Sequence, residues 1–285
     1  MKARAPRLAA ISLYPVKSTA AREVDRAHIG RYGLVGDREW MVVDGDGREA
    51  TARELPALLH VMASSWATGG PEGVDLRLDA PGVPGLELTC PGGDDREVQL
   101  FGESLVASLA GAHADAWLRR AVGRDDVSLV WCAAPEDRRV AFGSGLTGYA
   151  AFQDESAVSL VSAASIAQVN EWIGDPQPLP ASRFRANLLI DGVEPFAEDV
   201  WGAVRIGDAE LPVAGPVARC VMTTIDPLTL SRGKEPIRTL ARHRRWDGKT
   251  WIAVHLLVDR PGLIAVGDVV EVEPGSGAAP NAVMR

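Results

Sequence analysis

Short apolar segments separated by turn-forming residues run through most of the chain, and this pattern most constrains its fold. In the first half, segments 8–14, 38–43, 48–51, 74–79, 86–89, 96–100 and 104–108 are bounded by Pro, Gly or Asp. In the second half, segments 187–190, 204–206, 210–213, 250–258 and 268–273 repeat the pattern. Strands this short and frequent are typical of a curled sheet or a barrel. We therefore expect a mainly β fold with a few helices, a β-barrel-like α+β protein.

Two segments show the helical spacing of apolar residues. Residues 112–122 place apolar side chains among charged ones, and Gly123 follows as a stop. Residues 163–173 have Ser162 as a candidate N-cap and Gly174 as a stop. The length of 285 residues indicates about two domains. We place the first at 1–126 and the second at 127–275, followed by a Gly/Ala/Pro-rich tail at 276–285.

Charge and cysteine usage narrow the class of protein. Thirty Lys and Arg against 38 Asp and Glu give a formal charge of −8. This disfavours nucleic acid as a partner, since nucleic-acid binding requires a basic surface. No apolar run is long enough for a membrane-spanning helix, and the N-terminus lacks the pattern of a signal peptide. The three widely spaced cysteines suit a reducing compartment, so we expect a cytoplasmic protein without a membrane.

Two further patterns resemble known ligand motifs but lack their context. Gly143-Ser-Gly-Leu-Thr-Gly148 matches the dinucleotide-binding spacing, yet no helical run follows it and no acidic residue stands at the required distance. Asp44-Gly-Asp-Gly47 resembles the start of a calcium loop, but Leu55 occupies the position that needs Glu. We interpret the first as a loop and the second as a hairpin turn.

Four polar clusters interrupt apolar segments. They are Tyr14-Pro-Val-Lys17-Ser18, Gly33-Leu-Val-Gly-Asp37-Arg38-Glu-Trp40, Phe184-Arg185-Ala-Asn187 and Ala218-Arg219-Cys220. Taken singly, each is better explained as a solvated charge or a small buried thiol. Their occurrence together in one chain indicates a shared site.

With these clusters in place, the chain resembles the MOSC-domain proteins that carry a MOSC N-terminal β-barrel domain. Within that group it is most similar to the mitochondrial amidoxime-reducing component and its bacterial relatives. The matching motifs are YPVKS (14–18), GLVGDREWMVVD (33–44), TARELP (51–56), FRAN (184–187), RCVMTTIDP (219–227) and PGLIAVGD (261–268). The resemblance implies a MOSC N-terminal β-barrel domain packed on a MOSC β-barrel domain, with a cofactor cleft between them.

The cofactor that this resemblance implies is a molybdenum cofactor of the Mo-molybdopterin type. Arg, Lys and hydroxyl groups are the donors that a pterin phosphate requires. The cofactor-binding residues implied by the resemblance are Lys17, Ser18, Arg38, Ser156, Phe184, Arg185, Asn187, Arg219 and His255.

Cys220 is the implied metal ligand and a catalytic residue. Molybdenum bound through a dithiolene is soft, and a cysteinate suits its open position. Arg219 beside Cys220 favours the thiolate form. Asp154 is the second catalytic residue implied by the resemblance. Two positions differ from relatives: Ala218 stands where many have Ser, and His255 stands where others have a phenol or Asn.

The implied activity is reduction of N-hydroxylated small molecules by a molybdenum-dependent oxidoreductase. Residues after Glu273 contain no cysteine for an iron–sulfur cluster, so we expect electrons from a separate donor protein that holds haem, flavin or an iron–sulfur cluster. The alternative is a cofactor carrier or sulfur-handling module without turnover of its own. A scaffold that lost its cofactor is disfavoured, since all four polar clusters are present.

Overall fold

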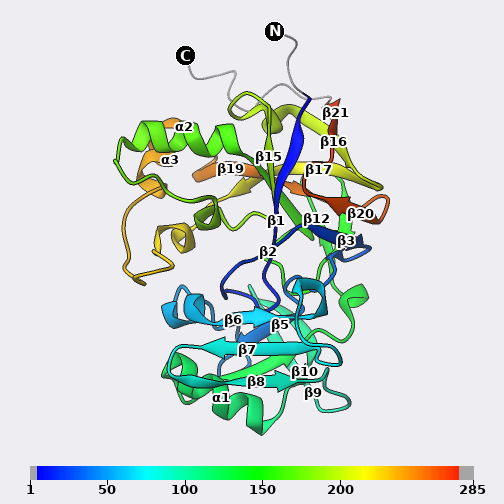
Figure 1. Ribbon diagram of the computed structural model, residues 1–285, viewed down its shortest axis with the longest axis vertical. Coiled ribbons are helices and arrows are strands. Elements are labelled where there is room, and N and C mark those ends of the chain that lie inside the picture. Colours follow the sequence, from blue (N-terminus) through cyan, green and yellow to red (C-terminus); the bar gives the residue numbers. More distant parts are fainter. Residues whose placement is uncertain (1–4, 276–285) are drawn as a thin grey trace.

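Strands dominate the regular structure of the computed structural model, which describes residues 5–275 (Figure 1). The largest sheet holds nine strands in the order β2-β1-β15-β14-β19-β17-β16-β21, with β18 paired to β19. These strands are β1 (Arg7–Leu13), β2 (Arg22–Val24), β14 (Val158–Ser162), β15 (Leu188–Asp191), β16 (Trp201–Ile206), β17 (Ala209–Ala218), β18 (Arg245–Trp246), β19 (Lys249–Leu256) and β21 (Val270–Pro274). This sheet forms the upper part of Figure 1. The predicted tail at 276–285 lies outside the described residues.

Two smaller sheets and helix α1 (Ala112–Val122) form the lower part of Figure 1. Their strand orders are β5-β11-β10-β9 and β6-β7-β8. The strands are β5 (Trp40–Val43), β6 (Met62–Ser64), β7 (Leu76–Ala80), β8 (Val83–Leu88), β9 (Asp95–Leu100), β10 (Glu103–Leu109) and β11 (Ser128–Trp131).

Short strands and turns connect the two parts. One sheet has the order β20-β3-β4, built from β3 (Arg26–Gly30), β4 (Gly33–Leu34) and β20 (Gly262–Ala265). A hairpin of β12 (Arg139–Ala141) and β13 (Thr147–Tyr149) carries residues 143–146 of the glycine-rich motif in its turn. The prediction of a loop is confirmed for these residues, whereas Thr147 and Gly148 belong to β13. The 3-10 turns are η1 (Pro56–His60), η2 (Trp66–Thr68), η3 (Pro135–Asp137), η4 (Ala181–Phe184), η5 (Ala197–Val200) and η6 (Val221–Thr224).

Helices α1 and α2 (Ala163–Ile173) have the predicted bounds because their stop signals are local. The Ser162 hydroxyl accepts a hydrogen bond from the Ser165 amide at 3.0 Å, as an N-cap does. Gly123 and Gly174 adopt left-handed φ values of 68° and 69° at the helix ends. Helix α3 (Ile237–His243) was not predicted, since its seven residues are too few to show an apolar stripe.

The prediction of a strand at residues 48–51 is wrong. The turn Asp44–Gly47 forms, and the Asp44 carboxylate accepts the backbone amides of Asp46 and Arg48. Beyond it, however, the backbone divides its hydrogen bonds: Ala50 pairs with β5 and Glu49 with β9. Only isolated bridges result. The mainly β prediction is confirmed, while the sheets of residues 5–275 are open rather than closed into barrels.

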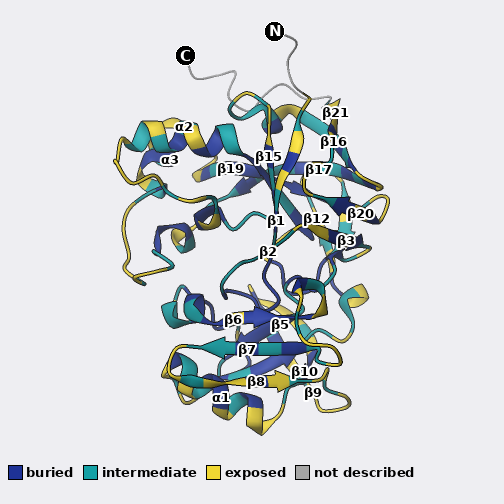
Figure 2. Ribbon diagram, in the orientation of Figure 1, coloured by how far each residue is buried: buried dark blue, intermediate teal, exposed yellow. Residues whose placement is uncertain are grey.

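The two largest of four hydrophobic clusters in the described residues lie one in each part of the molecule, and Figure 2 colours buried residues dark blue. The upper core includes Leu8, Leu160, Leu188, Ile206 and Leu256. The lower core includes Trp40, Leu58, Leu78, Trp117 and Leu129. The division at residue 126 stays a prediction, and strands pair across it in both directions. β11 pairs with β5 and β10 in the lower part, while β1 pairs with β15 in the upper sheet. Across residues 5–275, no helix combines the length and apolar character needed to cross a bilayer.

Candidate functional site

A cavity of ≈ 860 Å³ lies where the two parts of the molecule meet. Loops from both halves of the chain line it, and it brings together every residue that the sequence analysis selected. These residues are Lys17, Ser18, Arg38, Asp154, Ser156, Phe184, Arg185, Asn187, Arg219, Cys220 and His255. Within residues 5–275, no group of three or more His, Cys, Asp or Glu side chains is arranged to hold a metal ion by itself.

Two arginines, Arg38 and Arg185, stack on the ring of the buried Tyr14. We call the part of the cavity lined by these two residues and Arg219 the inner wall. The guanidinium carbons of Arg38 and Arg185 lie 4.4 Å and 4.2 Å from the centre of the Tyr14 ring. Both arginines adopt left-handed backbone conformations, with φ of 52° and 51°, as does Ser18 at 71°. Non-glycine residues hold such conformations only where surrounding structure enforces them. Arg38 pairs with Asp37 at 2.6 Å, whereas no carboxylate of the described residues lies within ion-pairing distance of Arg185.

Arg219 also lacks an acidic partner among residues 5–275. Its Nε donates to the Ile252 carbonyl at 3.0 Å and its Nη1 to the Phe184 carbonyl at 2.8 Å. Its Nη2 is buried without any hydrogen-bond partner. Burial lowers the pKa of Arg219 to about 10, and burial also lowers the pKa of Arg185. A buried donor without a partner costs free energy, so this wall is suited to an anion.

Lys17 is already paired with a carboxylate. Its ammonium donates to the Phe152 carbonyl at 2.7 Å and to Asp154. Burial acts to raise the pKa of Asp154, but the charge and hydrogen bond of Lys17 outweigh it and lower that pKa to about 2. The Asp154 side chain is 58% exposed and lines the cavity. Lys17 therefore differs from Arg185 and Arg219 in having its charge compensated within the protein.

The loop that carries Asp154 is held by Arg138, which the sequence analysis missed. The Arg138 guanidinium is buried and donates to the carbonyls of Ala151 and Gln153 at 2.8 Å and 2.6 Å. The Gln153 amide in turn donates to the Asp37 carbonyl at 2.9 Å. Its Nε also donates to the Glu103 carboxylate at 3.0 Å. Arg138 lies in none of the matched motifs, and all of these partners are distant in the sequence, so no local signal marked it.

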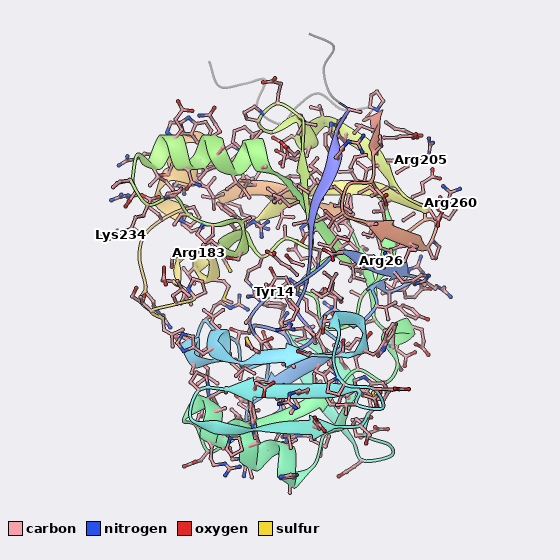
Figure 3. All side chains as sticks on the ribbon, viewed as in Figure 1. Tyr14, Arg26, Arg183, Arg205, Lys234 and Arg260 are labelled. Atoms are coloured by element: carbon pink, nitrogen blue, oxygen red, sulfur yellow. The ribbon has the colours of Figure 1, made fainter. Side chains whose placement is uncertain are left out.

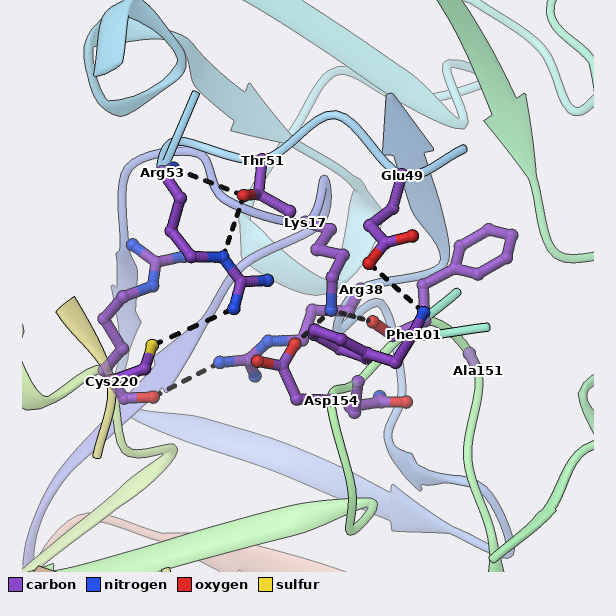
Figure 4. A network of polar contacts seen from close by, with 12 residues as sticks. Lys17, Arg38, Glu49, Thr51, Arg53, Phe101, Ala151, Asp154 and Cys220 are labelled. Carbon is purple, nitrogen blue, oxygen red and sulfur yellow. Dashed lines mark hydrogen bonds and ion pairs between the residues drawn. The ribbon is translucent and has the colours of Figure 1, made fainter. Parts of the chain in front are cut away.

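Cys220 is exposed and lines the cavity at what we call its mouth, two residues after the end of β17, and Figure 4 shows its sulfur facing Arg53. The cation in contact with its sulfur is Arg53, whose Nη1 is 4.0 Å from Sγ. Arg219, which the sequence predicts as the cation beside Cys220, interacts with Cys220 through its charge, while its Nε and Nη1 donate to backbone carbonyls. Arg53 also stacks over Phe101, 5.0 Å from the ring centre, and its Nε donates to Thr51 Oγ1 at 3.1 Å. Arg53 lies in the quoted motif TARELP but was not singled out.

The other two thiols are unlike Cys220. Burial raises the pKa of Cys90 to about 12, and the neighbouring Asp75 carboxylate adds to the effect. Burial also raises the pKa of Cys132 to about 12. Neither lines this cavity. Cys220 is therefore the cysteine that the fold presents to a ligand here.

His255 contacts both Ser156 and Glu155, and all three residues line the cavity. The Ser156 hydroxyl donates to the Val158 carbonyl at 2.7 Å, so it must accept from Nδ1 of His255, 2.8 Å away. The opposite ring atom, Nε2, then faces Glu155 Oε2 at 2.6 Å, out of line for a hydrogen bond. Contact with His255 lowers the pKa of Glu155. Sequence reasoning selected His255 and Ser156 but not Glu155.

Asn187 and Phe184 have mainly structural contacts. The Asn187 amide donates to the Ser12 carbonyl at 3.1 Å and accepts from the Ser159 amide and hydroxyl at 3.2 Å and 3.3 Å. It thereby ties β1 to β14 at the cavity wall. Phe184 is fully buried in a cluster with Val161, Leu240 and Ile252. Direct contacts of these two residues with a cofactor stay predictions.

Comparison with known proteins matches both halves of the chain to family models. Residues 5–125 match the MOSC N-terminal beta barrel domain, and residues 147–271 match the MOSC domain. The chain is 30% identical to mitochondrial amidoxime reducing component 2 of Rattus norvegicus, over 90% of this chain and 80% of that protein. It is 28% identical to mitochondrial amidoxime-reducing component 1 of Homo sapiens, over 92% and 82%. Molybdenum cofactor sulfurase of Danio rerio is 31% identical over 86% of this chain, which spans 31% of that relative.

Proposed function

The chain belongs to the MOSC-domain family, and from this membership and the cavity we propose that it binds a molybdenum–pterin cofactor and reduces N-hydroxylated compounds. The proposed reaction breaks the N–O bond of a substrate R–NH–OH. With two electrons and two protons it yields R–NH₂ and water. The observation that carries the proposal is the juxtaposition, in one cavity, of two half-buried guanidiniums without acidic partners in the described residues and an exposed thiol.

The inner wall fits the anionic part of such a cofactor. Arg219 Nη2 is an unpartnered buried donor, and Arg185 carries a charge that no described carboxylate compensates. Guanidinium groups match phosphate oxygens in geometry and form the stronger, charge-assisted hydrogen bonds. Arg185, Arg219 and Ser18 would therefore hold the phosphate and pterin, while Lys17 stays paired with Asp154.

The mouth of the cavity, around Cys220, is suited to the molybdenum end of the cofactor. Cys220 is a soft ligand, and the bound molybdenum would supply the two-electron chemistry of oxygen-atom removal. The chain's own residues would then handle protons. His255 and Glu155 both line the cavity, with Nε2 and Oε2 2.6 Å apart, and they would be the candidate proton donors to a bound substrate. Asp154 lines the same space and is held ionised by Lys17.

A second function has a specific observation in its favour. Relatives named molybdenum cofactor sulfurase are as similar to the chain as the amidoxime-reducing components are. A cofactor carrier or sulfur-handling module would use the same anion-binding wall, and Cys220 would be a sulfur acceptor instead of a permanent ligand. Such a module would bind the cofactor without reducing N-hydroxylated compounds.

The deciding experiment expresses the full chain in a host that synthesises the molybdenum cofactor. Molybdenum and pterin are then measured, and reduction of a simple hydroxylamine is followed with a chemically reduced viologen as electron source. We expect stoichiometric metal and turnover that stops in Cys220→Ser. Bound cofactor without turnover would favour the carrier, and a metal-free folded protein would contradict both functions.

A further inference from the structure

The segment from residue 228 to residue 249 carries a charge opposite to that of the whole chain. It contains seven Lys and Arg and two Asp and Glu, a formal charge of +5, whereas the chain has −8. Six of these cations are exposed: Arg232, Lys234, Arg238, Arg242, Arg245 and Lys249. Arg238 pairs with Glu235. For the other five, no carboxylate of residues 5–275 lies within ion-pairing distance.

Helix α3, in the middle of this segment, turns one face to the cavity and the other to solvent. Ile237 and Ala241, one turn apart, line the cavity. Arg238 and Arg242, also one turn apart, are exposed. The helix is therefore the wall between the basic surface and the space next to Cys220. An α-helix with its side chains is only about 10 Å across.

Exposed apolar residues border the same basic surface. Leu228 is 84% exposed and Val221 is 57% exposed. Val221 begins η6, whose Met222 and Thr223 line the cavity. The loop before α3 reaches across to the lower part of the molecule, since the Leu228 carbonyl contacts His60 and Arg232 donates to the Arg53 carbonyl. A few apolar groups within a charged rim are typical of a protein–protein interface.

We propose that this basic face, made by residues 228–249 with Val221, docks an acidic electron-transfer protein. The inference rests on the proposed function, which requires electrons from outside the chain. A donor of negative charge is repelled by most of a chain at −8 and attracted at this one segment, which selects its orientation. Seated on α3, its redox group would be separated from the cavity by little more than one helix.

The experiment uses the full chain loaded with cofactor and a purified acidic [2Fe–2S] ferredoxin as the probe. The variant reverses two exposed charges that do not line the cavity, Lys234→Glu and Arg242→Glu. The matched control reverses two exposed arginines on the opposite side of the molecule from Lys234, Arg26→Glu and Arg260→Glu (Figure 3). Turnover is measured with reduced ferredoxin and, separately, with reduced viologen. Ferredoxin binding is measured by calorimetry at low and high salt.

We expect the double variant to raise the KM for ferredoxin and weaken its binding about tenfold at low salt, an effect that high salt abolishes. The control should stay within about twofold, and viologen-driven turnover should be equal in all three proteins. Equal use of ferredoxin by the double variant and the parent would overturn the proposal. So would a basic face that binds vesicles of phosphatidylserine but not ferredoxin. Absence of viologen-driven turnover in the parent would refute the proposed function instead, and the binding titration would still decide the docking surface.

Discussion

The inner wall and the mouth of the cavity both carry cations, but the two sets are built differently. Arg38, Arg185 and Arg219 are held at the inner wall by stacking on Tyr14 or by backbone carbonyls. At the mouth, the exposed Arg245 and Lys249 are the first residues of β18 and β19. The inner cations are fixed in place before a ligand arrives, whereas the outer ones can reorient.

This difference determines what the cations of the inner wall and those at the mouth can each contribute to binding. A fixed, buried cation interacts strongly at short range and can define where a phosphate lies. An exposed cation contributes little to stability and is screened by salt, but it acts on the encounter with a charged partner. We therefore expect substitutions at the inner wall to have large effects that salt does not change, and substitutions at the mouth to have small effects that salt reduces.

The largest effect should come from Cys220, where the two regions meet. Cys220→Ser keeps nearly the same volume, but its oxygen is harder and does not replace a thiolate. The pterin should remain bound through the inner wall, while reductase activity falls by more than about 100-fold. Molybdenum X-ray absorption should lose the sulfur ligand. Cys132→Ser is the control, and a variant that loses pterin together with activity would contradict the separation of the two regions.

The next largest effect separates Arg185, which has no carboxylate partner among the described residues, from Lys17, which is paired with Asp154. Arg185→Ala should lower cofactor affinity about 30-fold, since a charged hydrogen bond contributes about 2 kcal/mol. It should change the melting temperature of the cofactor-free protein little. Lys17→Ala should do the reverse, because Phe152 and Asp154 lose their partner. Pterin fluorescence after denaturation measures occupancy. Equal loss of cofactor in both variants would show that pairing with Asp154 does not matter.

Sequence reasoning succeeded where the determining signals are local. Helices α1 and α2 were predicted to the residue because Ser162, Gly123 and Gly174 mark their ends. Helix α3 was missed because it is short, and β20 was missed because its partner β3 lies more than 200 residues earlier in the chain. A strand that depends on a distant partner has no local pattern of its own.

The candidate site shows the same division. Motif resemblance assembled eleven residues that all line one cavity. It could not show that Lys17 is neutralised by Asp154, 137 residues away, or that the Asn187 amide is used by Ser12, 175 residues away. It also missed Arg53, since only the fold brings residue 53 to residue 220. Ion pairs and hydrogen bonds between residues far apart in the sequence decide which cations can bind a ligand and which hold the fold together. The sequence alone does not show these contacts.

A smaller effect concerns the acid stability of the Lys17–Asp154 pair. The pKa of Asp154 is lowered from 3.8 to about 2 in the folded protein. The pair therefore contributes stability above pH 3.8, and this contribution is lost as the pH falls toward 2. Because the Asp154 side chain is 58% exposed, we expect no more than about 1 kcal/mol. Urea unfolding of the parent and Asp154→Asn should differ at pH 6 and converge near pH 2. A difference that grows toward low pH would contradict the assigned sign.

The smallest effect tests the mouth itself, through Arg53 and the Cys220 sulfur. In the cofactor-free protein at neutral pH, iodoacetamide should alkylate the exposed Cys220 ahead of Cys90 and Cys132. Those two thiols have pKa values of about 12, so almost none of either is thiolate. Arg53→Ala should slow alkylation of Cys220 about threefold, since an exposed cation 4.0 Å from sulfur stabilises the thiolate only modestly. Arg53→Lys, which keeps the charge, should recover part of the rate, and added salt should reduce the difference between parent and Arg53→Ala. If Arg53→Ala instead lowered the alkylation rate of Cys220 by 100-fold or more, and salt did not change this loss, Arg53 would belong with the fixed cations of the inner wall. Cys220 would then be part of the inner wall and not of the mouth.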